Sequence, residues 1–209
     1  MATGYMAIVG VDEVGTGAFA GPVVAAAVIL PLDSRIGELA DSKLMSPDAR
    51  ERVFDLIINR EFCWGVGEAS VIEIQEFGLR PANYLAMRRA IEMVRVADFA
   101  LVDAWTIPEL TIPQRGIVHG DRLVKSIAAA SVIAKVTRDR LMVQLHEQFP
   151  VYGFSANKGY GTMAHQEAIK RNGPSEAHRV GFIKSLIERK KVISLLTNSI
   201  ENDMIGFAD

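Results

Sequence analysis

The segment from Met6 to Leu30 reads MAIVGVDEVGTGAFAGPVVAAAVIL and carries the strongest fold signal in this 209-residue chain. Its two ends, Met6 to Val11 and Pro22 to Leu30, are rich in valine, isoleucine and alanine, and several glycines lie between them. Such runs, bounded by glycine and proline, are typical of β-strands. The segment therefore predicts two neighbouring strands, either as a hairpin or as an adjacent pair.

The remainder of the chain predicts an α/β domain whose later part is helical. Ser46-Pro47 is typical of a helix start, because serine caps free amide groups and proline fits the first helical turn. We expect a single domain over residues 1–209, with roughly 150–209 forming a helical C-terminal part packed on it. Apolar periodicity predicts the other elements: a strand at 62–69, a helix at 81–96, a strand at 99–102 before Asp103, a long helix at 122–148, a loop at 150–161, and short helices at 164–171 and 180–191.

Cysteine content and apolar runs limit where the protein is expected to reside. Cys63 is the one cysteine of the sequence, so no intrachain disulfide forms and the Cys/His spacings of zinc sites are absent. The run from Val23 to Pro31 has nine residues, far fewer than the roughly 20 that cross a bilayer. No basic segment precedes the first apolar run, as a secretion signal would require. We expect a cytoplasmic protein with no membrane association.

Charge is distributed unevenly along the chain, although the net charge is only -2. Residues 121–191 contain 13 Lys and Arg against 6 Asp and Glu, whereas the remainder contains 10 against 19. A basic half facing an acidic site suits a polyanionic substrate held over bound cations. Solvated helix faces explain these counts equally well.

Four acidic residues interrupt or directly follow apolar stretches, namely Asp12, Glu13, Asp103 and Asp121. Unpaired carboxylates are costly to remove from water, so several together indicate a compensating cation. Oxygen ligands favour Mg²⁺ or Mn²⁺, which in pairs support phosphodiester hydrolysis by activated water. Taken singly, a strand-end aspartate is more often a turn former, and Asp121 would be an ordinary N-cap of the long helix. Asp12 and Glu13 point to opposite faces of a regular strand, so we expect β-structure to bend or end there.

The connection Gly15-Thr16-Gly17 follows the first two of these carboxylates closely. It does not match the P-loop pattern, and the chain contains no Gly-x-Ser-x-Gly nucleophile elbow. Glycine pairs usually mark only turns. Beside carboxylates, however, they also let backbone amides and carbonyls approach a ligand such as a sugar hydroxyl.

Several short motifs follow one another between about Ile8 and Phe182. They are Val11-Asp12-Glu13-Val14-Gly15-Thr16-Gly17, Gly21-Pro22-Val23-Val24-Ala25-Ala26-Ala27, Asp41-Ser42-Lys43, Val102-Asp103, Gly120-Asp121, Ser126-Ile127-Ala128-Ala129-Ala130-Ser131, Ala134-Lys135-Val136-Thr137-Arg138-Asp139, Lys158-Gly159-Tyr160-Gly161-Thr162 and His178-Arg179. This ordered series resembles the ribonuclease HII family, which is type 2 ribonuclease H.

The resemblance implies an α/β ribonuclease H-like fold, with a mixed central sheet flanked by helices and a helical C-terminal extension. It also implies metal-dependent endonucleolytic cleavage of RNA in RNA/DNA hybrids and at single ribonucleotides embedded in duplex DNA, leaving 5′-phosphate and 3′-hydroxyl ends. The implied cofactor is Mn²⁺ or Mg²⁺, with two ions when substrate is bound. The implied partners are these nucleic acids, and we expect a monomer with no obligate protein partner.

The resemblance also assigns roles to individual residues. Tyr160 resembles the family tyrosine that stacks near the ribose and senses its 2′-hydroxyl, and ordinary aromatic packing is the alternative. The expected metal-binding and catalytic residues are Asp12, Glu13, Asp103 and Asp121. The expected substrate-binding residues are Gly15, Thr16, Gly17, Lys43, Lys158, Tyr160 and Arg179.

The three basic members of that last set are expected to contact phosphates, and solvated surface charge is the alternative. Asp139 is acidic and near in sequence, but its position predicts a helix-surface ion pair with Lys135, four residues earlier. His165 and His178 could carry protons, although a lone histidine is more often structural.

The chain departs from the family pattern at three places. Thr16 replaces the arginine of the usual Gly-Arg-Gly, so a guanidinium contact to phosphate is lost. We expect weaker substrate binding or an altered preference for single ribonucleotides, with the metal site intact. Leu44 stands where a second lysine is common and Ala104 where glycine is common, and neither change removes a proposed ligand. Two alternatives stay open: a noncatalytic hybrid-binding relative, and a ribonuclease H-like nuclease or strand-transfer enzyme acting on DNA, which leaves the tyrosine and glycine motifs unexplained.

Overall fold

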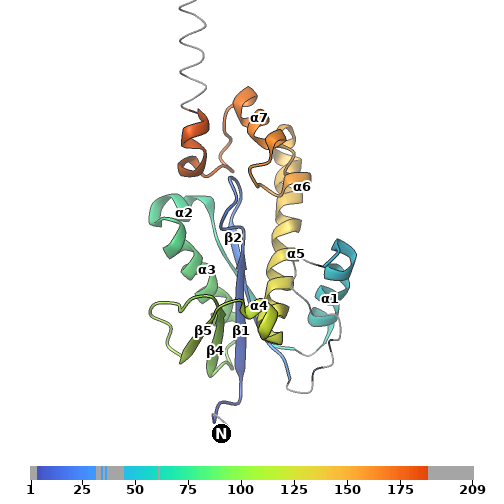
Figure 1. Ribbon diagram of the computed structural model, residues 1–209, viewed down its shortest axis with the longest axis vertical. Helices are drawn as coiled ribbons and strands as arrows, with labels where there is room; N and C mark the ends of the chain where they lie inside the picture. The colour runs from blue at the N-terminus through green and yellow to red at the C-terminus, as the bar shows by residue number, and fades with distance from the viewer. Residues whose placement is uncertain (1–3, 32–33, 35, 37–44, 61, 188–209) are drawn as a thin grey trace, which may run out of the picture.

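The computed structural model describes residues 4–31, 34, 36, 45–60 and 62–187 (Figure 1). The expectations for Lys43, for Leu44 and for residues 188–209 lie outside this part of the chain. Among the helices in the described ranges, none combines the length and the apolar character that a bilayer span requires.

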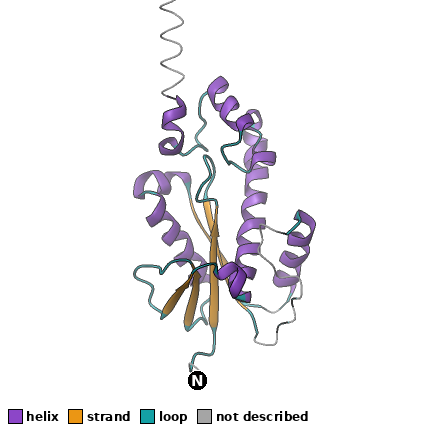
Figure 2. Cartoon of the chain, in the orientation of Figure 1, coloured by secondary structure: helices purple, strands orange, loops and turns teal. Residues whose placement is uncertain are grey.

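A five-stranded mixed sheet forms the centre of the molecule (Figure 2). Its strands are β1 (Ile8–Val14), β2 (Val23–Ile29), β3 (Trp64–Ala69), β4 (Phe99–Asp103) and β5 (Gln114–Ile117). They are arranged in the order β3-β2-β1-β4-β5. The pairs β1·β2 and β2·β3 are antiparallel, whereas β1·β4 and β4·β5 are parallel. The prediction of two neighbouring strands in the opening segment is confirmed as an antiparallel pair.

β1 extends beyond its parallel neighbour β4. Pairing with β4 ends one residue before Asp12, whereas pairing with β2 continues to Val14. Asp12 and Glu13 therefore lie inside the strand, opposite Ala26 and Ala25. β1 ends at Val14, one residue after Glu13, so the strand ends just past the two carboxylates and not at them. On the other side β4 stops, and that strand end lies beside the two acidic residues.

Helices cover both faces of the sheet (Figure 1), and each face has its own apolar core. Alternate residues of β2 divide between the two cores, since Ala25 and Ala27 belong to one and Ala26 to the other. The helices are α1 (Pro47–Asn59), α2 (Val71–Phe77), α3 (Leu79–Met93), α4 (Gly120–Leu123), α5 (Lys125–Gln148), the 3₁₀ turn η1 (Pro150–Tyr152), α6 (Phe154–Asn157), α7 (Met163–Asn172) and a further helix at 180–187. The cores pack α2 and α3 on one face, and α1 and α5 on the other.

The long helix α5 approaches the sheet closely, as its alanine run predicts. Ala129 and Ala130 are 0% exposed and share a core with Ala26 of β2. A Cβ atom on Gly10 of β1 would collide with the backbone of Ile127. The small residues on both elements therefore set the distance between α5 and the central strand.

Several element bounds differ from the sequence expectation. The expected helix at 122–148 is divided, because Val124 has extended backbone angles (φ -127, ψ 116) between α4 and α5. The sequence does not predict α2, which Ser70 and Glu73 begin with a reciprocal capping box. Nor does it predict β5, or the short turns η1 and α6 within 150–161. The start of α1 is confirmed, with Ser46 as its N-cap.

A third apolar cluster joins the C-terminal helices to the far end of α5. Met142 of α5 packs there with Phe154, Ile169 and Ile183. Ala20, from the connection between β1 and β2, belongs to the same cluster. The C-terminal part of the described chain therefore packs against the glycine-bearing connection that the sequence singled out.

Candidate functional site

Asp12 is a buried carboxylate on the central strand. Its side chain is 6% exposed, and its Oδ1 accepts a hydrogen bond from the Glu13 N–H at 2.8 Å. Ser131, on α5, also hydrogen-bonds to this carboxyl group. Burial raises the pKa of Asp12 well above its ordinary value, and the negative charges of Glu13 and Asp103 raise it further. The structure thus brings three of the four predicted carboxylates into one electrostatic neighbourhood.

Asp103 ends β4 and is tied to the start of α4. Its Oδ1 accepts a hydrogen bond from the Gly120 N–H at 2.8 Å. Asp121, the next residue, is 7% exposed in the first turn of α4. The N-cap position of this helix is occupied by His119, so the explanation of Asp121 as a helix N-cap is wrong. The Gly120 hydrogen bond instead holds the helix start that carries Asp121 against the end of β4.

This donor set fits a hard divalent cation by its chemistry. All four residues offer carboxylate oxygens, which Mg²⁺ and Mn²⁺ prefer. A cation bound by Asp12 would offset both the burial of its charge and the repulsion from Glu13 and Asp103, which together raise the pKa of Asp12. Within the described ranges, no three His, Cys, Asp or Glu side chains stand close enough to hold a metal ion as they are.

The connection after β1 is held between two other segments of the backbone. On one side, the Phe19 N–H donates to the Gly159 carbonyl at 2.8 Å. On the other side, the Gly21 N–H donates to the Ala177 carbonyl at 2.9 Å, and Ala20 forms a β-bridge with His178. Three motifs that lie far apart in the sequence therefore form one layer at the connection that follows β1.

Two buried arginines hold this connection through its carbonyl groups. Arg179 is 0% exposed and donates to the carbonyls of Gly15 at 2.7 Å and Gly21 at 2.9 Å. Arg138, also 0% exposed, donates from Nη2 to the Ala20 carbonyl at 3.1 Å. Burial, followed by the charge of Arg138, lowers the pKa of Arg179 to about 9. A side chain this buried does not face a phosphate at the surface, and Arg179 instead positions the glycine segment, residues 15–21, through its carbonyl groups.

Arg138 is a site residue that the sequence expectation missed. Its guanidinium also bonds to the carbonyls of Pro22 at 3.0 Å and Lys158 at 2.9 Å. Helical periodicity was the available signal, because Arg138 lies four residues from both Ala134 and Met142, which are buried. An arginine on the buried stripe of a helix indicates a set of internal acceptors.

Only one of the two glycines in Gly15-Thr16-Gly17 is required by its surroundings. Gly15 has φ +91, and a Cβ atom there would lie 2.7 Å from Cδ of Arg138. Gly17 is exposed, has no positive φ, and has nothing within 4 Å of an added Cβ. The Thr16 carbonyl accepts from Arg179 Nη1 at 3.2 Å. The segment is therefore fixed at Gly15 and open at Gly17.

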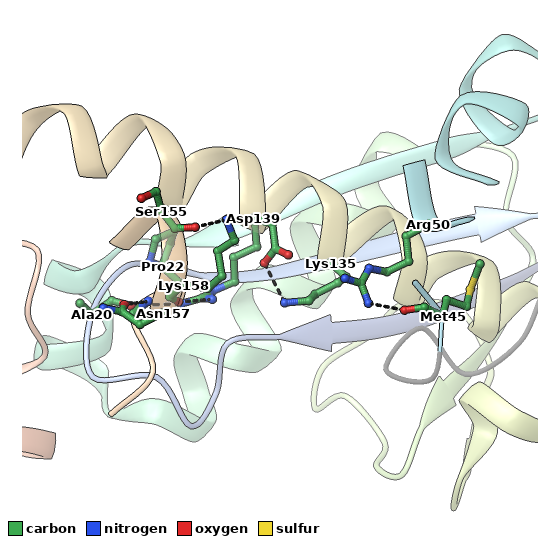
Figure 3. Close-up of polar contacts among 11 residues, drawn as sticks. Ala20, Pro22, Met45, Arg50, Lys135, Asp139, Ser155, Asn157 and Lys158 are labelled. Atoms are coloured by element: carbon green, nitrogen blue, oxygen red, sulfur yellow. Dashed lines mark hydrogen bonds and ion pairs between the residues drawn. The ribbon is translucent and has the colours of Figure 1, made fainter. Parts of the chain in front are cut away.

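Tyr160 lies beside the same layer. Its ring centroid is 5.4 Å from the guanidinium carbon of Arg138, a cation–π contact. Lys158, two residues earlier, donates from Nζ to the Ser155 carbonyl at 2.6 Å (Figure 3). The structure therefore places Tyr160 and Lys158 next to the glycine segment, and their roles toward substrate stay predictions.

The remaining polar residues that the sequence singled out have structural partners. Asp139 accepts from Lys135 Nζ at 2.7 Å, which confirms the predicted ion pair on α5 (Figure 3). His165 and His178 are buried and lie against each other, with 3.0 Å between their Nε2 atoms. Neither histidine is a lone side chain facing the carboxylates.

Comparison with known proteins finds relatives by sequence and by fold. A sequence profile of ribonuclease HII matches residues 9–185. Ribonuclease HII of Lachnoclostridium phytofermentans is 50% identical over 183 residues, which cover 87% of this chain and 72% of that protein. The crystal structure of ribonuclease H2 from Pyrococcus horikoshii is similar with a TM-score of 0.73 at 23% identity, covering 89% of this chain and 99% of that one. Bst-RNase HIII in complex with Mn²⁺ also has a TM-score of 0.73, at 18% identity, covering 92% and 71%. The α/β fold is thus that of the ribonucleases H.

Proposed function

The chain belongs to the ribonuclease HII family, and on that premise we propose that it is a metal-dependent endoribonuclease acting on RNA/DNA hybrids and on single ribonucleotides within duplex DNA. Nuclease activity of the ribonuclease H type follows from the family. The choice of substrate, the use of Mg²⁺ or Mn²⁺, and 5′-phosphate and 3′-hydroxyl product ends are the proposed part.

Asp12, Glu13, Asp103 and Asp121 would hold the metal ions. Two such ions, when bound, supply an activated water and stabilise the leaving oxygen of the phosphodiester. The protein orients the carboxylates with fixed donors: the Glu13 amide on Asp12, and the Gly120 amide on Asp103. These hydrogen bonds limit carboxylate rotation, which favours a defined site for the scissile phosphate.

Ribose recognition is proposed for the glycine segment together with Tyr160. The open space around Gly17 lets a sugar approach the backbone closely. The Tyr160 ring lies on the Arg138 guanidinium, which limits how far it turns. A main-chain surface and an aromatic ring that both lie against Arg138 suit a ribose whose 2′-hydroxyl is read by hydrogen bonding and whose sugar packs on the ring. Lys158 stays a proposed phosphate contact, as does Lys43.

The burial of Asp12 beside Glu13 and Asp103 carries this proposal. Folding gains nothing from three neighbouring carboxylates, and burial and repulsion together raise the pKa of Asp12. The glycine segment begins three residues later, at Gly15. A cation-dependent site and a ribose-sized backbone surface are therefore adjacent in the chain.

The test compares incision of a duplex that contains one ribonucleotide with an all-DNA control, in Mg²⁺, in Mn²⁺ and in chelator. We expect incision only at the ribonucleotide and only with metal. Asp12→Asn should lower the rate by at least about a hundredfold, since even residues that merely support metal ligands cost ten- to a hundredfold. Asp139→Asn is the matched control, because it removes a carboxylate of α5 that is paired with Lys135 and not with the other carboxylates.

A noncatalytic or weakly active hybrid-binding protein is the second candidate, and it rests on Thr16 in place of the usual arginine. A threonine there cannot make the bidentate phosphate contact of an arginine. Tight binding of the hybrid without incision in either metal would support this candidate and overturn the first. Incision of the all-DNA control would instead indicate a deoxyribonuclease.

A further inference from the structure

Two buried histidines form a pair that the proposed chemistry does not use. His165 on α7 is 0% exposed and His178 is 1% exposed. Their Nε2 atoms lie 3.0 Å apart, a hydrogen-bond distance. Aromatic rings surround them, with the Tyr152 centroid 4.6 Å from His178 and the Phe154 centroid 5.4 Å from His165. A polar pair buried among rings must be satisfied by specific donors and acceptors.

The outer partners of the pair determine where its protons lie. Nδ1 of His165 is 2.9 Å from the Tyr160 carbonyl, which only accepts, so this nitrogen carries the proton. Nδ1 of His178 receives the Ser175 N–H at 2.9 Å, so this nitrogen carries none. For two neutral rings, His178 Nε2–H then donates to His165 Nε2. The Tyr160 end and the Ser175 end each require this same placement of protons. The hydrogen bonds therefore form one continuous chain from Ser175 through His178 and His165 to Tyr160.

This chain of hydrogen bonds connects the two segments proposed to read ribose. His165 reaches the backbone of Tyr160, and His178 forms the β-bridge to Ala20 at the end of the glycine segment. The Tyr160 carbonyl accepts one further hydrogen bond, from the Thr162 N–H at 2.8 Å. The histidine pair is therefore a link between Tyr160 and the segment on the opposite side of the layer.

We propose that His165 and His178 are positioning residues for ribose recognition, acting by setting the Tyr160 backbone relative to the glycine segment. His165 supplies the donor to Tyr160, and His178 holds His165 in the tautomer that can donate. This inference rests on the proposed function of Tyr160. It assigns the pair no proton transfer to substrate.

Two substitutions of His165 test whether its hydrogen bond to Tyr160 matters, or only its packing in the core. Asn places an amide N–H near the position of Nδ1 and keeps a donor for Tyr160. Gln places its amide near Nε2 and keeps only the contact to His178. We expect His165→Gln to lower kcat/KM for the single-ribonucleotide duplex roughly tenfold, the effect of about one lost buried hydrogen bond. His165→Asn should retain activity within about threefold of the unmodified protein. His146→Gln, on α5 and outside this chain of hydrogen bonds, is the control.

A double-substitution cycle with Tyr160→Ala tests whether the effect passes through Tyr160. If it does, His165→Gln should change kcat/KM by less than about twofold when Tyr160 is already alanine. Thermal unfolding of each variant, measured alongside, confirms that the compared proteins are folded. Equal losses from His165→Gln in both backgrounds would show a purely structural pair and overturn the inference. So would an Asn variant as impaired as the Gln variant.

The same experiment separates this inference from the proposed function. No incision by the unmodified protein would refute the proposed function and, with it, the inference. Incision that Tyr160→Ala leaves unchanged would refute ribose sensing by Tyr160, and the inference falls with that role. A large Tyr160 effect with an additive His165 effect would refute the inference alone.

Discussion

Replacing Gly15 with alanine places a methyl group directly against the buried Arg138. The added Cβ would lie 2.7 Å from Cδ and 2.8 Å from Cζ of that side chain, well inside contact distance. Gly15 also has φ +91, a conformation that side-chain-bearing residues rarely adopt. The substitution therefore combines backbone strain with displacement of a side chain that is bonded to three carbonyls.

The size of the effect follows from these two terms. The left-handed backbone costs about 1–2 kcal/mol for a residue with a Cβ. A hydrogen bond from a charged donor contributes about 1.5–3 kcal/mol, and a shift of Arg138 should weaken at least one of its three. We expect Gly15→Ala to lower the free energy of unfolding by about 2.5–5 kcal/mol. That is a large share of the 5–15 kcal/mol typical of a folded protein.

Urea unfolding followed by circular dichroism measures this free energy, and Gly17→Ala is the matched control. Gly17 is two residues away and has open space around its Cα, so alanine there should change stability by no more than about 0.5 kcal/mol. If Gly15→Ala falls within about 1 kcal/mol of Gly17→Ala, the proposed contact between Gly15 and Arg138 does not constrain the segment, and the reasoning fails.

Three further outcomes are expected. Burial, and then the charge of His165, lower the pKa of His178 from 6.5 to about 4. Between these two pH values the unfolded chain binds more protons than the folded chain. The free energy of unfolding therefore falls as pH drops from about 6.5 to about 4. The loss is roughly 3 kcal/mol, and it should shrink in His178→Gln when unfolding is compared at pH 7 and pH 4.5. Ser70→Ala removes the N-cap of α2 and should cost about 1 kcal/mol in urea unfolding, and no loss would contradict the capping role. Thr16→Arg should raise kcat/KM on a single-ribonucleotide duplex by restoring a phosphate contact, and an unchanged or lower value would refute that account.

Local composition is sufficient for the elements that form the middle of the fold. β1 and β2 bury continuous apolar runs, and the start of α1 follows from Ser46, whose side chain accepts the Ala49 N–H at 3.2 Å. β5 is different. Its sequence is QRGI, and it is a strand because it pairs with β4 at the edge of the sheet. The short helix before the break at Val124 likewise begins at Gly120, whose N–H bonds to Asp103 at the end of β4.

The sequence by itself determined the chemical groups of the candidate site and their family. Asp12, Glu13 and the glycine segment stand next to one another in the chain, and their chemistry needs no structure to be read. The ion pair of Asp139 follows from helical spacing alone.

Only the tertiary structure decided which charges are buried and what they bind. Arg179 meets Gly15 across 164 positions of sequence, and Arg138 meets Ala20 across 118. A sequence motif shows that a residue carries a guanidinium. Whether that guanidinium is buried, and which carbonyls it binds, depends on distant segments that pack together in the three apolar clusters. Solvation is a property of the whole packed chain, so the two arginines became supports of the site only when it folded.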